Sequence, residues 1–83
     1  GEFDLPLAAA GLYYDFVVQN STGIKVVANS SATISIMGLA GNTVSASSGN
    51  IVNSTPGTAI RLAAINSSQW VAISQNSTAW AVT

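Results

Sequence analysis

Eighty-three residues are enough for one domain, and 48% of them are hydrophobic while only 6% are charged. Two Lys or Arg residues stand against three Asp or Glu residues, which gives a net charge of −1. Cysteine and histidine are absent, which excludes disulfides, Cys/His zinc sites and catalytic triads with a histidine base. Two cations cannot form the basic patch that holds a phosphate backbone, so the composition argues against nucleic-acid binding.

Residues 1–4 suggest a cloning remnant or a linker, and residues 5–83 are expected to form a single β domain. The first expected strand, residues 12–18, shows the clearest alternation. Even-numbered residues from Leu12 to Val18 share one face, and odd-numbered residues from Tyr13 to Val17 share the other. The strands expected along the chain are 12–18, 24–28, 32–37, 43–46, 51–52, 59–65, 69–74 and 78–82.

The residues between and within these segments favour an all-β chain. Val, Ile and Thr suit pleated sheets, Ser, Asn and Gly suit turns, and typical surface-helix formers are nearly missing. Strands at short intervals with short turns predict a small antiparallel β-sandwich or a barrel-like meander. No run approaches the ~20 apolar residues of a membrane-spanning helix, so no membrane insertion is expected.

Asparagine followed by Ser-Ser or Ser-Thr recurs between the apolar runs. The Asn side chain can accept a hydrogen bond from nearby backbone, and Asn tolerates positive φ, so these triplets predict turns. They are also formal N-glycosylation acceptors, although no disulfide or signal peptide accompanies them. The triplets begin at Asn20, Asn29, Asn53, Asn66 and Asn76.

The few charged residues offer little catalytic chemistry. Asp4 and Asp15 are expected to be surface carboxylates, and the chain is not expected to be an enzyme or to hold a metal or cofactor. Asp15 and Lys25 lie on consecutive expected strands and could pair across a hairpin. A sharper alternative is a buried pair between Arg61 and Asp15 that sets the register of an oligomer.

The large aromatic residues allow two interpretations. They could pack in a core or an interface, which is favoured for Trp70 because Val71 and Ile73 are its neighbours. They could instead stack on sugar rings beside neutral polar side chains. Trp80, close to the end of the sequence, is the better candidate for an exposed aromatic, and Trp80 and Tyr14 are the predicted ligand-binding residues.

Small chains usually need an additional source of stability, because a chain of this size buries only roughly 60–65% of its unfolded surface. Disulfides are excluded here, and an ordinary metal site lacks ligands. Charged residues are depleted in interface cores, as they are in this chain. Self-association, with Ile, Val and Ala faces packed around a common axis, is therefore expected.

Five segments form a further pattern along the chain: 5–18 (LPLAAAGLYYDFVV), 24–28 (IKVVA), 57–64 (GTAIRLAA), 69–73 (QWVAI) and 79–82 (AWAV). Their order resembles a small β-module that recurs in virion proteins of tailed bacteriophages, in fibres, spikes and head decorations. The sequence departs from it at the last turn, where residues 76–79 stand in place of a glycine before Trp80.

The resemblance implies a non-enzymatic structural or adhesion module of the virion, assembled as an intertwined or closely packed homotrimer that contacts other virion proteins. An alternative is a carbohydrate-binding module that recognises a glycan on the host surface. No functional residue carries over from the resemblance, because its motifs are patterns of packing.

Overall fold

The computed structural model describes residues 1–37, 42–76 and 80–83, and these residues form nine short strands. These ranges contain no helix, so the predicted all-β class is confirmed. The last expected strand, 78–82, lies partly outside the described residues. The strands are β1 (Glu2–Asp4), β2 (Tyr13–Val17), β3 (Ile24–Val27), β4 (Thr33–Met37), β5 (Asn42–Val44), β6 (Asn50–Asn53), β7 (Ala59–Asn66), β8 (Gln69–Gln75) and β9 (Ala81–Val82).

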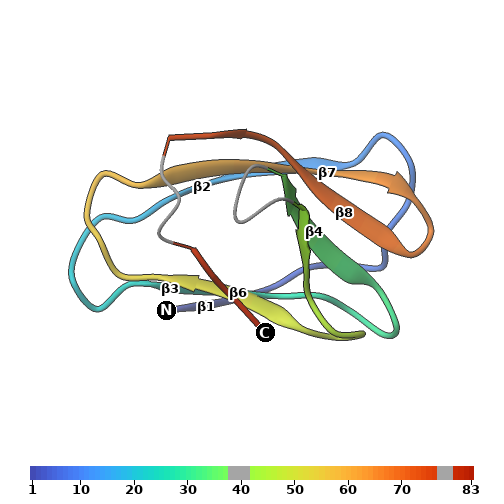
Figure 1. Ribbon diagram of the computed structural model, residues 1–83, viewed down its shortest axis with the longest axis horizontal. Coiled ribbons are helices and arrows are strands. Elements are labelled where there is room, and N and C mark those ends of the chain that lie inside the picture. The colour runs from blue at the N-terminus through green and yellow to red at the C-terminus, as the bar shows by residue number, and fades with distance from the viewer. Residues whose placement is uncertain (38–41, 77–79) are drawn as a thin grey trace.

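The strands are arranged in two sheets that lie in separate layers (Figure 1). The four-stranded sheet has the order β1-β3-β6-β9, and the five-stranded sheet has the order β2-β7-β8-β4-β5. The first and last strands, β1 and β9, are the two edges of the four-stranded sheet. Two facing layers are compatible with the β-sandwich that the sequence predicted.

Both sheets are mixed, so the expected antiparallel sandwich or meander is wrong in its connectivity. β1 pairs with β3 and β4 pairs with β8 in parallel, and the remaining strand pairs are antiparallel. The reason is that β2 and β3, consecutive in the chain, belong to different sheets. Each then takes its antiparallel partner from a distant segment: β2 from β7 and β3 from β6.

The segment suggested as a linker or cloning remnant forms a strand. Glu2, Phe3 and Asp4 pair with Lys25 to Val27 of β3, and the N–H of Leu5 continues the pairing by donating to the carbonyl of Val27 at 2.8 Å. The Phe3 ring reaches the other layer, with its centroid 5.1 Å from that of Phe16. β1 therefore helps to close one side of the space between the sheets.

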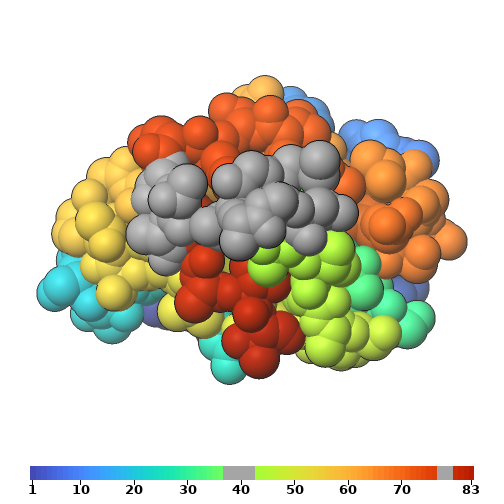
Figure 2. Space-filling view, viewed as in Figure 1, coloured from blue at the N-terminus to red at the C-terminus, as the bar shows by residue number. Residues whose placement is uncertain are grey.

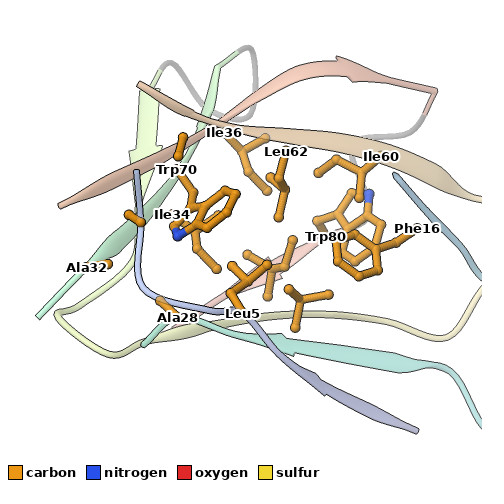
Figure 3. Packing of buried hydrophobic residues seen from close by; sticks show 14 of the residues in the cluster. Leu5, Phe16, Ala28, Ala32, Ile34, Ile36, Ile60, Leu62, Trp70 and Trp80 are labelled. Carbon is orange, nitrogen blue, oxygen red and sulfur yellow. The ribbon is translucent and has the colours of Figure 1, made fainter. Parts of the chain in front are cut away.

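The core lies between the two layers and is built from their inward-facing side chains. Figure 3 shows Trp70 beside Ile34 toward one end and Trp80 beside Phe16 toward the other, with Leu5 between them. Burying one large apolar side chain contributes about 1.5–3 kcal/mol. The buried hydrophobic residues are Leu5, Ala8, Phe16, Val18, Val26, Ala28, Ala32, Ile34, Ile36, Ile51, Ile60, Leu62, Ala64, Trp70 and Trp80.

Three of the five Asn triplets form the same local turn, as their composition predicted. The Oδ1 atoms of Asn20, Asn53 and Asn66 each accept a hydrogen bond from the backbone N–H two residues later, at 3.0, 2.8 and 2.8 Å. This contact replaces a backbone acceptor where the chain leaves a strand. Asn76 acts differently: its Oδ1 accepts from the N–H of Ala59 at 2.9 Å and ties the end of β8 to the start of β7.

Gly23 is required by both its backbone conformation and its surroundings. Its φ is +82°, and a Cβ there would lie 2.7 Å from the carbonyl oxygen of Asn53. Gly57 also has a positive φ, +89°, but a Cβ would meet no atom within 4 Å. Substitution of Gly57 therefore measures the cost of the backbone conformation alone, and substitution of Gly23 measures that cost together with the steric overlap.

We expect Gly23→Ala to lower the free energy of unfolding by about 2–4 kcal/mol, from the left-handed conformation and the steric overlap together. Gly57→Ala should lower it by about 1–2 kcal/mol, from the conformation alone. Urea denaturation followed by circular dichroism measures both. Equal losses for the two variants would contradict the close packing of Gly23 against β6.

Candidate functional site

The two predicted ligand-binding residues, Tyr14 and Trp80, both face the interior. Tyr14 is half-buried, and its ring centroid lies 5.6 Å from that of Phe3 and 5.9 Å from that of Trp70. Trp80 is only 4% exposed, so the expectation that it is an exposed aromatic is wrong. Trp80 therefore presents no ring face on which a sugar could stack, and the Tyr14 ring packs against other aromatic rings.

Trp80 is buried because the end of the described chain is anchored. The N–H of Thr83 donates to the carbonyl of Asn50 at 2.9 Å, and the N–H of Ala46 donates to the carbonyl of Thr83 at 3.3 Å. Figure 2 shows residues 80–83 in red against the yellow-green segment that follows β5. Proximity to the end of the sequence therefore does not expose the indole ring.

The exposed aromatic of the five-stranded sheet is Tyr13. It is 60% exposed and lies on the outer face of β2, together with Asp15. The Arg61 guanidinium from β7 lies over the Tyr13 ring, with Cζ 5.1 Å from the ring centroid. Asp15 and Arg61 face each other in the register of β2 and β7. We call Tyr13, Asp15 and Arg61 the outer-face cluster.

The ion pair in this cluster has two parallel contacts. The Arg61 Nε donates to Asp15 Oδ1 at 2.6 Å, and Nη2 donates to Oδ2 at 2.9 Å. The two side chains are 47% and 52% exposed, so water screens the pair. The hydrogen bond from Arg61 lowers the pKa of Asp15, and the same hydrogen bond raises the pKa of Arg61. Both groups are therefore charged at neutral pH.

Of the two ion pairs expected for Asp15, the structure contains the one with Arg61. Asp15 pairs with Arg61, although the pair is exposed in the single chain. The alternative, a hairpin pair between Asp15 and Lys25, is wrong because β2 and β3 belong to different sheets. Lys25 instead lies opposite Glu2 in the register of β3 and β1.

An open depression of about 540 Å³ borders the cluster. Its lining includes Ser74 and Asn76 beside the Asp15–Arg61 pair, with Val17 and Ala59 as apolar members. The Asn76 amide is already engaged, because its Nδ2 donates to the carbonyl of Gly57 at 3.1 Å and its Oδ1 accepts from Ala59. The lining of the depression therefore offers a ligand both polar and apolar side chains, and the charges of Asp15 and Arg61 neutralise each other.

The alternation in β2 already contained the signal for Tyr13. The even-numbered residues of 12–18 share one face, and Phe16 and Val18 on that face are buried. Tyr14 shares the same face, so the alternation itself indicates an inward Tyr14 and an outward Tyr13. Trp80 had no comparable signal, because it precedes a strand of only two residues, β9, whose partner β6 is distant in sequence.

We expect the Asp15–Arg61 pair to contribute to stability in full above about pH 4 and to lose this contribution at lower pH. The pKa of Asp15 is lowered in the folded chain, so the contribution is present above the unfolded pKa of about 3.9 and is lost as the pH falls through the lower, folded pKa. Asp15→Asn removes this contribution at every pH. The wild type should therefore melt above the variant at pH 7, and the difference should shrink toward pH 2. A difference that does not change with pH would contradict the pair.

The described residues contain no group of three or more His, Cys, Asp or Glu side chains that could hold a metal ion. Among the same residues, no helix has the length and apolar character needed to cross a membrane. No protein-family model, curated protein or solved structure matches the chain.

Proposed function

We propose that the chain is a non-enzymatic structural and adhesion module of a tailed-bacteriophage virion, and that it forms a homotrimeric β-sandwich assembly within a fibre, spike or head decoration. The class of virion protein comes from the sequence resemblance. The observation that carries the assembly role is the outer face of the five-stranded sheet, where Tyr13, Val17, Ile65 and Ile73 are each more than half exposed. A soluble monomer rarely leaves so many large apolar side chains on one face.

Assembly of three copies would strengthen binding without any new contact on the single chain. Weak contacts on each copy, to other virion proteins or to the host surface, combine in a trimer because the second and third contacts are intramolecular. Light scattering tests this proposal. The purified chain should have three times the chain mass of 8.4 kDa, and a folded species with the mass of one chain would contradict it.

A carbohydrate-binding module is the second candidate, and the outer-face cluster favours it. Tyr13 is an exposed aromatic beside a carboxylate and a guanidinium, and an open depression adjoins them. This site replaces Tyr14 and Trp80, whose rings face inward. A glycan array with the wild type and Tyr13→Ala tests it: binding that the substitution removes would support this function, and absence of binding by the wild type would reject it.

The two candidates compete for one surface. If copies of the chain cover the outer face of β2 and β7, the cluster is closed to a glycan. If the cluster binds a glycan, that face must stay open in the virion. A trimer that binds no glycan therefore favours the structural role.

A further inference from the structure

The outer face of the five-stranded sheet carries a continuous row of mostly apolar residues. The register places Tyr13 opposite Ala63, Ala63 opposite Val71, Val71 opposite Ser35, and Ser35 opposite Val44. Residues that face each other in a register point to the same side of a sheet. The row thus crosses all five strands from β2 to β5, and Ser35, which is buried, is its one polar member.

Two irregularities in the pairing of β7 and β8 accompany further exposed apolar side chains. The register shifts between Ala64 and Asn66 and again between Arg61 and Leu62, opposite Ala72 and Ser74. Ile65 and Ile73 are the additional residues at these shifts, and they are 53% and 57% exposed. Both isoleucines remain in water in the single chain. We call Tyr13, Val17, Ile65, Val71 and Ile73 the outer apolar face.

The opposite side of the molecule has a different character. The outer side of the four-stranded sheet carries Glu2 and Lys25, which face each other, and Asp4, two residues from Glu2 along β1. These are three of the five charged residues of the chain, and their sum is −1. The hydrogen bond between Glu2 and Asp4, together with the charge of Asp4, raises the pKa of Glu2. Two copies of this side would bring like charges together.

The outer apolar face has no such conflict with a copy of itself. The two charged residues beside it on the outer side of the sheet, Asp15 and Arg61, are held to each other by two hydrogen bonds within one chain. A second copy brings another neutral pair, so contact creates no like-charge repulsion. Neither ion loses its partner when water is removed, which avoids the large cost of an unpaired buried charge. Tyr and Arg are also residues that frequently dominate the binding energy of interfaces.

The size of this face suits an interface between copies. The layers are stacked in the plane of Figure 1, so each face extends along the longest and shortest dimensions of the molecule, 31 Å and 21 Å. These dimensions bound the face, and an interface of standard size, which buries roughly 800 Å² on each partner, would use most of it.

We infer that the outer face of β2, β7 and β8 is the surface on which copies of this chain pack against one another, and that the Asp15–Arg61 pair of each copy is enclosed in the assembly. The inference rests on the proposed homotrimer and names the surface that forms it.

Single cysteine variants test this surface, because the chain has no cysteine of its own. Ile73→Cys places a thiol on the outer apolar face, and Val52→Cys places one on the outer side of the four-stranded sheet, where Val52 is 37% exposed. Both substitutions leave the core untouched. The rate of reaction with a bulky maleimide is measured for each folded variant, together with its mass in solution.

We expect the Ile73→Cys thiol to react at least about tenfold more slowly than the Val52→Cys thiol in the assembled protein, and at an equal rate once urea unfolds both variants. A trimer in which the Ile73→Cys thiol reacts freely and the Val52→Cys thiol is protected would overturn the inference but keep the proposed trimer. A monomeric wild type, together with free reaction of the thiol in each of the two folded variants, would overturn the proposed function as well.

Discussion

Replacement of Trp80 by alanine is expected to lower the free energy of unfolding by about 3–5 kcal/mol, the range found for truncation of buried Phe and Trp side chains. The side chain is 4% exposed and fills the space beside Phe16 and Ile60 between the two sheets (Figure 3). Such a loss is large for so short a chain, because stabilities of whole domains are about 5–15 kcal/mol. The variant should therefore be partly or wholly unfolded at 37 °C.

Trp80→Phe is the matched control. Phenylalanine keeps much of the apolar volume and removes Nε1, which is buried and has no hydrogen-bond partner in the described part of the chain. Loss of an unpaired buried donor offsets part of the packing loss, so the expected decrease is below about 2 kcal/mol. Thermal unfolding followed by tryptophan fluorescence and circular dichroism compares the variants. A Trp80→Ala variant as stable as the wild type would show that the indole ring is not part of the core.

Ile60→Asp is expected to abolish cooperative folding, whether or not copies of the chain associate. Ile60 is 2% exposed and faces the interior from β7, so an aspartate there must bury a carboxylate or open the sheets. Either outcome costs several kcal/mol. This variant cannot report on the interface between copies, because Ile60 lies in the core of the single chain.

Ile73→Asp makes the same chemical change on the outer apolar face. Ile73 is 57% exposed, and the core packs within a single chain, so the folded β unit should persist. The expected species is a folded monomer with the circular dichroism spectrum of the wild type. Two results would contradict the assignment of Ile60 to the interior and Ile73 to the outer face. One is a cooperative unfolding transition for Ile60→Asp, and the other is the absence of such a transition for Ile73→Asp.

Local pattern was a reliable guide where a strand has one buried face. The alternation of residues 12–18 and the burial of Trp70 were both predicted, because each depends on neighbours in the same strand. The Asn triplets were interpreted correctly for the same reason: a side chain that hydrogen-bonds two residues along the chain acts within its own turn. Asn20, Asn53 and Asn66 show this directly.

The division of strands between layers could not be predicted in this way. The turn at residues 18–23 is as short as many hairpin loops, yet it leads from one sheet to the other. Nothing local distinguishes a hairpin from such a crossing, and the choice depends on which distant strands bury β2 and β3. The parallel pair of β4 and β8 likewise joins strands that are far apart in the chain, so no local pattern predicts it.

The candidate site shows the same limit. Asp15 and Arg61 are 46 residues apart in sequence, and only the register of β2 and β7 brings them together. Their opposite charges suggested the pair, but the cation–π contact to Tyr13 and the adjoining depression follow from geometry that charge alone does not specify. Trp80 shows the converse, because anchoring by Asn50 and Ala46 buries a residue that its position in the sequence seemed to expose.

Sedimentation equilibrium of the purified wild-type chain at neutral pH tests the central claim most directly. We predict one folded species with three times the mass of the 8.4 kDa chain, over a concentration range in which circular dichroism shows the β fold to be intact. A cooperatively folded species that sediments as a single chain at every concentration would contradict the account, because the outer apolar face would then be stable in water without a copy to cover it.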